Sequence, residues 1–370
     1  MYSGYRKFAK WTGFVILVLA LLGGCERTGT GDDHGTHTYG HLYVLNQNVT
    51  NPNGGTIFVY NDSDLSTRVD SFGSAIPQPH WMIYDPNGAN YYIVSRTVPG
   101  RIAKFDALTN ALIDTITTAG SLFPTCMAVS GDGVYGYLCD FTSGTTPGHI
   151  HRYNLNTMTF VDSVLGNGAQ SHDLMFTQDY SKLVAVSRST DDVTIVSFPS
   201  ETVVKIPLDS NNVIPISPVY GPYGVHIDHK DSLAYVNCLL NGQVRIVDLK
   251  AERVIDSVLI PFVAGCNYSP NGPTMSTIAH DDSKVYVTTQ CGNSLVVIST
   301  ATRQIITTIL FSTDRAFGVT QNHDGSRVYV ACANADGQPG RIYVIDGVNL
   351  EKLDSIDVGI NSFGLYWHEH

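Results

Sequence analysis

The chain has 370 residues, a formal net charge of -11 at pH 7 and 22 lysine and arginine residues, with no basic run. This balance argues against a nucleic-acid partner, which needs a concentrated basic surface. It also argues against a broad patch for anionic lipid headgroups, so membrane attachment would depend on a lipid anchor alone.

Residues 1–24 have the features of a lipoprotein signal peptide. A basic start precedes an apolar run over residues 11–22, which is shorter than the roughly 20 apolar residues of a membrane-spanning helix and fits the h-region of a secretory signal. The run ends in Leu-Gly-Gly-Cys, which resembles the lipobox of bacterial lipoproteins and implies that Cys25 is lipidated. A plain signal peptide with a chance cysteine and an uncleaved anchor are the alternatives.

Residues 25–40 are polar and rich in Gly, Thr, Asp and His, which predicts a flexible tether. Residues 41–370 remain for the folded part. We therefore expect a protein of the cell envelope, lipid-anchored to the outer membrane or to the periplasmic face of a membrane.

One pattern recurs from Tyr43 to the end of the chain. An apolar strand leads through a turn with Asp or Gly into a second strand, and two more strands follow. The second strand carries an aligned residue in seven copies, 43–51 residues apart: Tyr43, Tyr92, Tyr137, Val184, Tyr235, Tyr286 and Tyr329. Such short β-branched and aromatic runs between Gly, Asn, Asp and Pro are typical of strands, and no segment has a sustained helical period.

Four strands per repeat of this length predict the blade of a propeller. One sheet cannot bury both of its faces, whereas sheets stacked around an axis bury them against their neighbours. We therefore predict an all-β fold in which residues 41–370 form a single seven-bladed β-propeller of four-stranded blades. A β-sandwich or a solenoid would not explain the constant order. We interpret the acidic residue of the fourth strand as protection of an outer edge, at Asp70, Asp114, Asp162, Asp256 and Asp354.

The register of the last repeat predicts how the ring closes. Aligned on the repeat before it, the C-terminal strand at residues 363–367 supplies the missing inner strand of the blade that begins at Leu42. This closure pins a terminus that would otherwise fray. It also makes His41 and His368 near cross-strand neighbours.

The segments at residues 324–330 and 344–346 resemble the YVTN family of β-propeller repeats, which are WD40-like. Residues 105–110 resemble that family's turn between the third and fourth strands. The resemblance covers residues 40–370 and implies the propeller fold, although Val184 replaces the usual tyrosine and the loop at 46–55 is long. It implies little about activity, because the family includes surface proteins, binding subunits and a few enzymes.

The first residue of each inner strand is predicted to point towards an axial funnel, the default ligand site of such a fold. These residues are His80, Thr125, His172, Tyr223, Thr274, Phe317 and Phe363. Asp173 is placed to orient the imidazole of His172. The alternative is that these side chains bond loop backbones and close the channel. A metal shared by His80 and His172 would need a third ligand, which the sequence does not identify.

Two other groups of histidines are candidate Zn²⁺ or Cu²⁺ sites. His149 and His151 share one face of a strand, which as an alternative is simply solvated. Ring closure brings a second group to the rim opposite the funnel, where two unrelated polar ends are the alternative: His34, His37, His41, His368 and His370. No other cofactor is indicated, and covalent haem is not expected because C-x-x-C-H is absent.

Six cysteines follow Cys25. An even count in an oxidising compartment allows disulfides without fixing their connectivity. Two pairs are candidates that only geometry can decide: Cys126 with Cys139 across one hairpin, and Cys266 with Cys291 on the funnel face.

The sequence contains no nucleophile elbow, phosphate loop or dinucleotide fingerprint. Our first hypothesis is a non-enzymatic, membrane-anchored binding module that holds a protein, peptide or small-molecule ligand at the funnel. The second is an extracytoplasmic enzyme or enzyme subunit with a metal at the funnel, because lactone-processing, lyase and dehydrogenase-subunit activities occur on similar propellers.

Overall fold

The computed structural model describes residues 40–49, 54–118, 122–141, 149–165, 168, 170–209, 219–261, 272–312, 315–334 and 337–369. Contacts divide the chain into Met1–His37 and Thr38–His370, and all described residues belong to the second unit. The predicted signal peptide, Cys25 and nearly all of the predicted tether lie outside these residues, as do His34, His37 and His370. No helix in the described part is long and apolar enough to cross a membrane.

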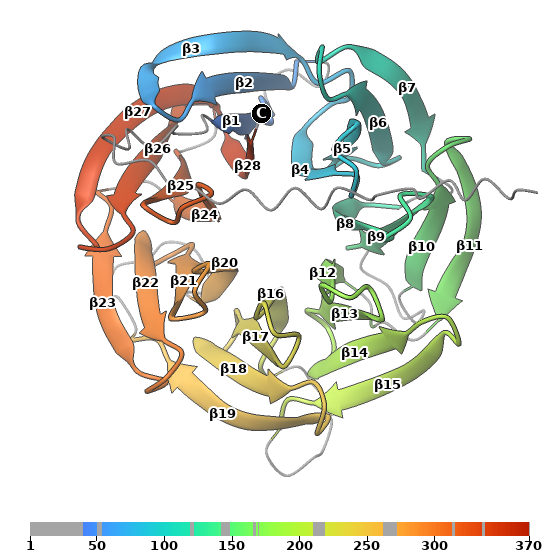
Figure 1. Ribbon diagram of the computed structural model, residues 1–370, viewed down its shortest axis with the longest axis vertical. Coiled ribbons are helices and arrows are strands. Elements are labelled where there is room, and N and C mark those ends of the chain that lie inside the picture. The colour runs from blue at the N-terminus through green and yellow to red at the C-terminus, as the bar shows by residue number, and fades with distance from the viewer. Residues whose placement is uncertain are drawn as a thin grey trace, which may run out of the picture. The chain divides into compact units, whose positions relative to one another are not determined.

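The described residues form seven sheets of four antiparallel strands, arranged as the blades of a propeller (Figure 1). From the axis outwards, the first blade contains β28 (Ser362–Glu369), β1 (Gly40–Asn46), β2 (Thr56–Asn61) and β3 (Asp64–Gly73). The second contains β4 (Pro79–Tyr84), β5 (Asn90–Ser95), β6 (Arg101–Asp106) and β7 (Leu112–Thr117). The third contains β8 (Pro124–Val129), β9 (Tyr135–Asp140), β10 (His149–Asn154) and β11 (Thr159–Leu165).

The other four blades repeat the same order. The fourth contains β12 (Ser171–Phe176), β13 (Lys182–Ser187), β14 (Asp192–Ser197) and β15 (Thr202–Pro207). The fifth contains β16 (Pro222–Ile227), β17 (Leu233–Cys238), β18 (Gln243–Asp248) and β19 (Arg253–Leu259). The sixth contains β20 (Pro273–Ile278), β21 (Lys284–Thr289), β22 (Ser294–Ser299) and β23 (Ile305–Leu310). The seventh contains β24 (Arg315–Gln321), β25 (Arg327–Ala333), β26 (Pro339–Asp346) and β27 (Lys352–Ile360).

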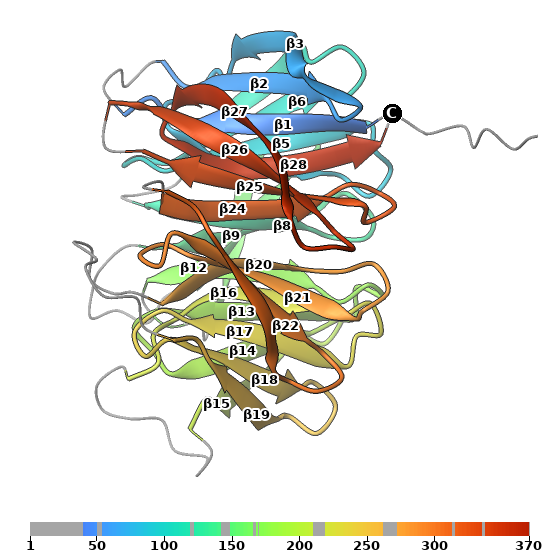
Figure 2. The same ribbon diagram turned by 90° about the vertical axis from the view of Figure 1, so that its left-hand side faces the viewer.

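The two faces of the propeller differ in what they carry. We call the face on which the inner strands begin the funnel face, and the face on which they end the turn face. The turns between first and second strands lie on the turn face, together with the start of β1 and the end of β28. Figure 1 views the molecule from the turn face, and the same face lies on the right in Figure 2.

Strand β28 closes the ring by pairing with β1, which confirms the predicted closure. The register places His41 opposite His368, as the sequence predicted. The carboxylate of Asp62 accepts hydrogen bonds from Gly40 N at 3.2 Å and from Trp367 Nε1 at 2.9 Å. A Cβ on Gly40 would lie 2.1 Å from the Trp367 ring, so only glycine allows this approach. One aspartate thus ties the two ends of the propeller together.

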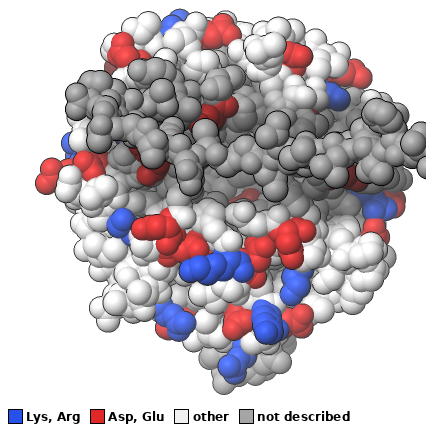
Figure 3. All heavy atoms as spheres, in the orientation of Figure 1, with Lys and Arg blue, Asp and Glu red and all other residues white. Residues whose placement is uncertain are grey.

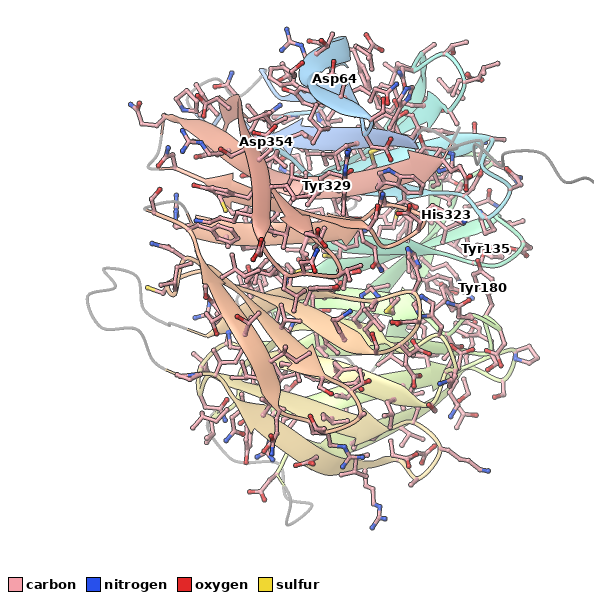
Figure 4. All side chains as sticks on the ribbon, turned by 60° about the vertical axis from the view of Figure 1, so that its left-hand side comes forward. Asp64, Tyr135, Tyr180, His323, Tyr329 and Asp354 are labelled. Carbon is pink, nitrogen blue, oxygen red and sulfur yellow. The ribbon has the colours of Figure 1, made fainter. Side chains whose placement is uncertain are left out.

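The hydrophobic core lies between the blades, as expected for sheets that bury both faces. The aligned residues of the second strands are almost completely buried, and they are Tyr43, Tyr92, Tyr137, Val184, Tyr235, Tyr286 and Tyr329. Tyr235, for example, packs with Ile278 and Val285 of the following blade. Figure 4 shows Tyr329 inside its blade, whereas Asp354 lies on the outermost strand. The repeated tyrosine is therefore a spacer between neighbouring sheets.

The repeated aspartate of the fourth strand has a bonding role. Its Oδ1 accepts a hydrogen bond from the next amide, as in Asp70 with Ser71 N at 2.7 Å and Asp256 with Ser257 N at 2.8 Å. In Asp70 the second oxygen reaches the following blade, where it accepts from Asn110 Nδ2 at 2.9 Å. Both oxygens of Asp162 instead bond Arg152 of the same blade. Aspartates such as Asp70 and Asp256 lie beside a register shift in their strand pairs, so the signature marks a bulge.

Trp367→Ala tests the closure. The change removes the bond to Asp62 and the packing on Gly40, so the free energy of unfolding should fall by roughly 3 kcal/mol, as for other aromatic truncations. Urea denaturation followed by circular dichroism measures this. Val348→Ala is the control, because Val348 is 75% exposed and its loss should cost less than about 0.5 kcal/mol. Equal effects of the two variants would contradict this account of the closure.

Candidate functional site

Five of the seven predicted funnel residues meet on the axis. Ring centres lie 6.0 Å apart for His80 and His172, 6.0 Å for His80 and Phe363, 4.7 Å for Phe317 and Phe363, and 6.1 Å for Tyr223 and Phe317. We call these five residues the axial plug. All of them are buried, with at most 9% of their surface exposed. They pack against one another across the axis, where the sequence analysis predicted a pocket rim.

The two threonines of the predicted set bond to backbone instead. Thr125 Oγ1 donates to the carbonyl of His172 at 2.7 Å. Thr274 Oγ1 donates to the carbonyl of Thr288 at 3.2 Å. Both threonines are fully buried. Their hydroxyls serve the contacts around the axis, which is the structural alternative considered for this set.

The carbonyls of residues in the axial plug are contact points between blades. His172 Nδ1 donates to Tyr223 O at 3.0 Å, and Thr288 Oγ1 donates to Phe317 O at 2.6 Å. At other positions the carbonyl lies against a glycine of the preceding blade. A Cβ added to Gly318 would lie 2.3 Å from Phe363 O, and a Cβ added to Gly364 would lie 2.6 Å from His80 O. Neighbouring inner strands therefore approach too closely for any side chain there.

His172 presents an unprotonated nitrogen inside the plug. A carbonyl only accepts hydrogen bonds, so the bond to Tyr223 O places the proton on Nδ1. The other nitrogen, Nε2, is buried and has no partner among the described residues. Burial lowers the pKa of His172 well below its usual value, and His80 and Arg96 act in the same direction. The side chain is therefore neutral at pH 7, with a buried lone pair.

His80 has the complementary tautomer. Its Nδ1 accepts from Gln47 Nε2 at 2.8 Å, which leaves the proton on Nε2. Burial, with a smaller effect of Arg96, lowers the pKa of His80 well below its usual value. The rings of His80 and His172 are nearly perpendicular, at 88°. One imidazole therefore offers a donor and the other an acceptor at the same point of the axis.

Arg96 brings a positive charge to this centre. It follows β5 on the funnel face, and its guanidinium lies 5.4 Å from the Phe123 ring centre and 5.9 Å from that of Phe141. Phe141 in turn lies 5.6 Å from the His172 ring. The Nε of Arg96 is buried and lacks a hydrogen-bond partner among the described residues. Arg96 thus has a buried N–H without a partner among these residues, and its positive charge acts on His172, whose pKa it lowers.

Arg96 was not among the residues predicted for the site, nor was Arg188, whose charge likewise lowers the pKa of His172. The sequence does contain a repeated motif that could have identified them: Val-Ser-Arg, followed by Thr or Ser, occurs at the end of the second strand in both the second and the fourth blade. Both arginines therefore follow equivalent strands, β5 and β13, on the funnel face.

Asp173 acts on the backbone of the next blade. Its Oδ1 accepts from Leu174 N and its Oδ2 from Val225 N, both at 2.9 Å. The His172 imidazole is oriented by Tyr223 O instead, which corrects our prediction that Asp173 orients it. Burial raises the pKa of Asp173 to about 7, although the hydrogen bonds to Val225 and Leu174 oppose this.

The two predicted cysteine pairs have different outcomes. Cys126 and Cys139 are free and buried, so the proposed disulfide across that hairpin is wrong. Cys139 Sγ accepts a hydrogen bond from Ser171 Oγ at 3.0 Å. Cys291 is disulfide-bonded, and its predicted partner Cys266 lies outside the described residues.

In the described ranges, no three His, Cys, Asp or Glu side chains lie close enough together to hold a metal ion. The rings of His149 and His151 are 6.0 Å apart, and His151 Nδ1 bonds Ser163 Oγ at 2.9 Å. His368 stacks on Tyr84 at 3.7 Å. The pair of His41 and His368 therefore has no third metal ligand among these residues, and its other predicted partners lie outside them.

Known proteins share this fold. Residues 44–349 match the family model described as Lactonase, 7-bladed beta-propeller. The periplasmic gluconolactonase of Pseudomonas aeruginosa is 17% identical over 89% of this chain and 99% of its own, with a TM-score of 0.70. A Lactobacillus plantarum protein is 16% identical over 90% of this chain and 100% of its own, also with a TM-score of 0.70.

A Bacteroides fragilis protein provisionally described as a 6-phosphogluconolactonase is 15% identical over 90% of this chain and 99% of its own, with a TM-score of 0.68. At these identities the solved structures establish a shared fold only. No curated protein sequence matches the chain significantly.

Asp173→Asn should change how stability depends on pH. The pKa of Asp173 is about 7 in the folded chain against a usual 3.8. The folded state therefore holds this proton more tightly, and the resulting stability is lost as pH rises from about 4 to about 7. The variant cannot ionise, so its free energy of unfolding should improve relative to wild type between pH 5 and pH 8. Urea denaturation at pH 5 and at pH 8 measures the free energy of unfolding. If it changes equally between these pH values in the wild type and the variant, the raised pKa of Asp173 is contradicted.

Proposed function

The chain belongs to the family of seven-bladed β-propeller lactonases, and we propose that it hydrolyses a lactone at the funnel-face end of the axis. One observation carries this proposal: His172 Nε2, an acceptor, and Arg96 Nε, a donor whose charge acts on His172, are both buried without hydrogen-bond partners among the described residues. Leaving such groups unpaired costs free energy. A bound water and a substrate carbonyl would satisfy both.

In the proposed reaction His172 acts first as a base and then as an acid, and Arg96 stabilises negative charge. His172 Nε2 takes a proton from a water molecule while the water oxygen attacks the lactone carbonyl carbon. Arg96 stabilises the negative charge that develops on the carbonyl oxygen. The ring C–O bond then breaks, and the departing alkoxide takes a proton back from the His172 imidazolium. The sum is lactone plus water giving a hydroxy acid.

His80 and Arg188 support this chemistry. The Nε2–H of His80 can donate to the ring oxygen as it leaves, because the ring lies 6.0 Å from that of His172. Arg188 adds a second positive charge near His172, which would favour the carboxylate product. Both imidazoles stay neutral at pH 7, so one acts as base and the other as donor without prior titration.

We propose an aldonolactone as the substrate class, because the similar Pseudomonas aeruginosa structure is described as a gluconolactonase. We place the activity outside the cytoplasm, with the disulfide at Cys291 and the predicted signal peptide as support. Of the two hypotheses drawn from the sequence, the comparisons favour the enzyme over the binding module.

His172→Gln should lower kcat/KM for D-glucono-1,5-lactone by roughly 10²–10⁴, the usual contribution of a general base. His226→Gln is the matched control, because His226 is also an inner-strand histidine but lies in β16 outside the plug. Hydrolysis is followed by proton release, with the spontaneous rate subtracted, and should occur in the envelope fraction.

The pH profile provides a second test. The pKa of His172 lies well below 6.5, so the base stays unprotonated and the rate should remain flat as pH falls from about 8 to about 6. A rate that halves near pH 6.5, or a His172→Gln variant with the wild-type rate, would refute the assigned base.

A further inference from the structure

A cavity lies around the axis on the turn face, at the opposite end from the proposed catalytic centre. Its volume is about 740 Å³, within the range of ordinary small-molecule sites. The inner strands β4, β8, β12, β16 and β28 form its wall beyond the axial plug, with turns such as the one after β4. Figure 3 views the molecule from this face, where acidic and basic side chains both reach the surface.

Aromatic and aliphatic side chains form most of the wall. The aromatic members are Trp81, Tyr84, Phe176, Tyr180, Tyr366 and His368. Tyr84 is the centre of a stack, with ring centres 3.7 Å from His368 and 5.3 Å from Tyr366. Figure 4 shows Tyr180 at the turn-face side of the molecule. Ring faces carry negative electrostatic potential and attract organic cations.

The charged side chains of the wall are of one sign. Asp85, Asp228 and Asp231 line the cavity, and no lysine or arginine among the described residues does. Asp228 accepts from Ser232 N of its own turn at 2.7 Å, and Asp231 accepts from Gln178 N of the preceding blade at 2.7 Å. These backbone bonds hold the two carboxylates at the cavity wall.

Asp85 is not satisfied in the same way. It is only 6% exposed, and its Oδ2 accepts from Asn90 Nδ2 at 2.9 Å. Its Oδ1 is buried and has no hydrogen-bond partner in the described part of the chain. A buried carboxylate oxygen without a partner is costly, and a positive charge in the cavity that Asp85 lines would offset this cost.

We propose that this cavity binds an organic cation, an alkylated ammonium group on an aromatic or alkyl body. A metal ion does not fit the arrangement, since no three ligating side chains converge in the described residues. An ammonium group spread over several carbons suits dispersed carboxylates and aromatic faces. Its apolar body would contact the side chains of Met127, Leu174 and Ile227.

The test uses benzyltrimethylammonium as the probe. Isothermal titration calorimetry with the full-length protein should show saturable binding of this cation and none of benzenesulfonate, an anion with the same ring. Asp85→Asn should weaken cation binding by at least about tenfold. Asp132→Asn is the matched control and should leave binding unchanged, because Asp132 occupies the corresponding turn of the third blade outside the cavity wall.

Circular dichroism checks that both variants are folded, and asparagine can keep the bond between position 85 and Asn90. Equal binding of benzenesulfonate, no binding of the cation, or unchanged binding in Asp85→Asn would overturn the proposal. D-glucose that binds while the cation does not would identify a neutral polyol site instead. The His172→Gln variant should bind the cation normally, so failure of this site and failure of the lactonase proposal are distinguishable.

Discussion

The structure depends on how closely the inner strands approach one another around the axis. The carbonyls of the plug residues meet the preceding blade either at a glycine, as with Gly318 against Phe363 O, or at a donor, as with Thr125 against His172 O. The bond from His172 Nδ1 to Tyr223 O is one member of this set. A contact required for packing thereby fixes a tautomer, and the tautomer provides the unprotonated nitrogen on which the proposed chemistry depends.

The axial plug separates two environments of opposite character. On the funnel face, the charge of Arg96 acts on both neutral imidazoles and that of Arg188 acts on His172, which suits a polarised carbonyl and an anionic product. On the turn face, the cavity wall carries carboxylates such as Asp85 and, among the described residues, no lysine or arginine. Burial strengthens both effects, because charges interact more strongly where solvent is excluded. The two proposed sites on the axis would therefore bind ligands of different charge. Trp81 lines the turn-face cavity and also packs against the plug.

The repeat made the fold predictable, because each blade must bury the same positions and the period therefore recurs in the sequence. The closure followed from the same register, and the pairing of His41 with His368 agrees with it. The site was harder to predict. The inner-strand positions identified the plug residues, but not that their rings fill the axis, since this depends on contacts between blades. The same limit applies to the backbone partners of Asp173, to the free thiol of Cys126 and to the turn-face cavity. Each depends on contacts or gaps between side chains and backbone that produce no regular spacing in the sequence.

The state of the His172 imidazole is the most direct test of the account. Long-range ¹H–¹⁵N NMR spectra of the histidine side chains report which ring nitrogen carries the proton. At pH 6 the structure predicts a neutral His172 with its proton on Nδ1 and a bare Nε2. A doubly protonated ring, or a proton on Nε2, would contradict both the axial contact and the catalytic role.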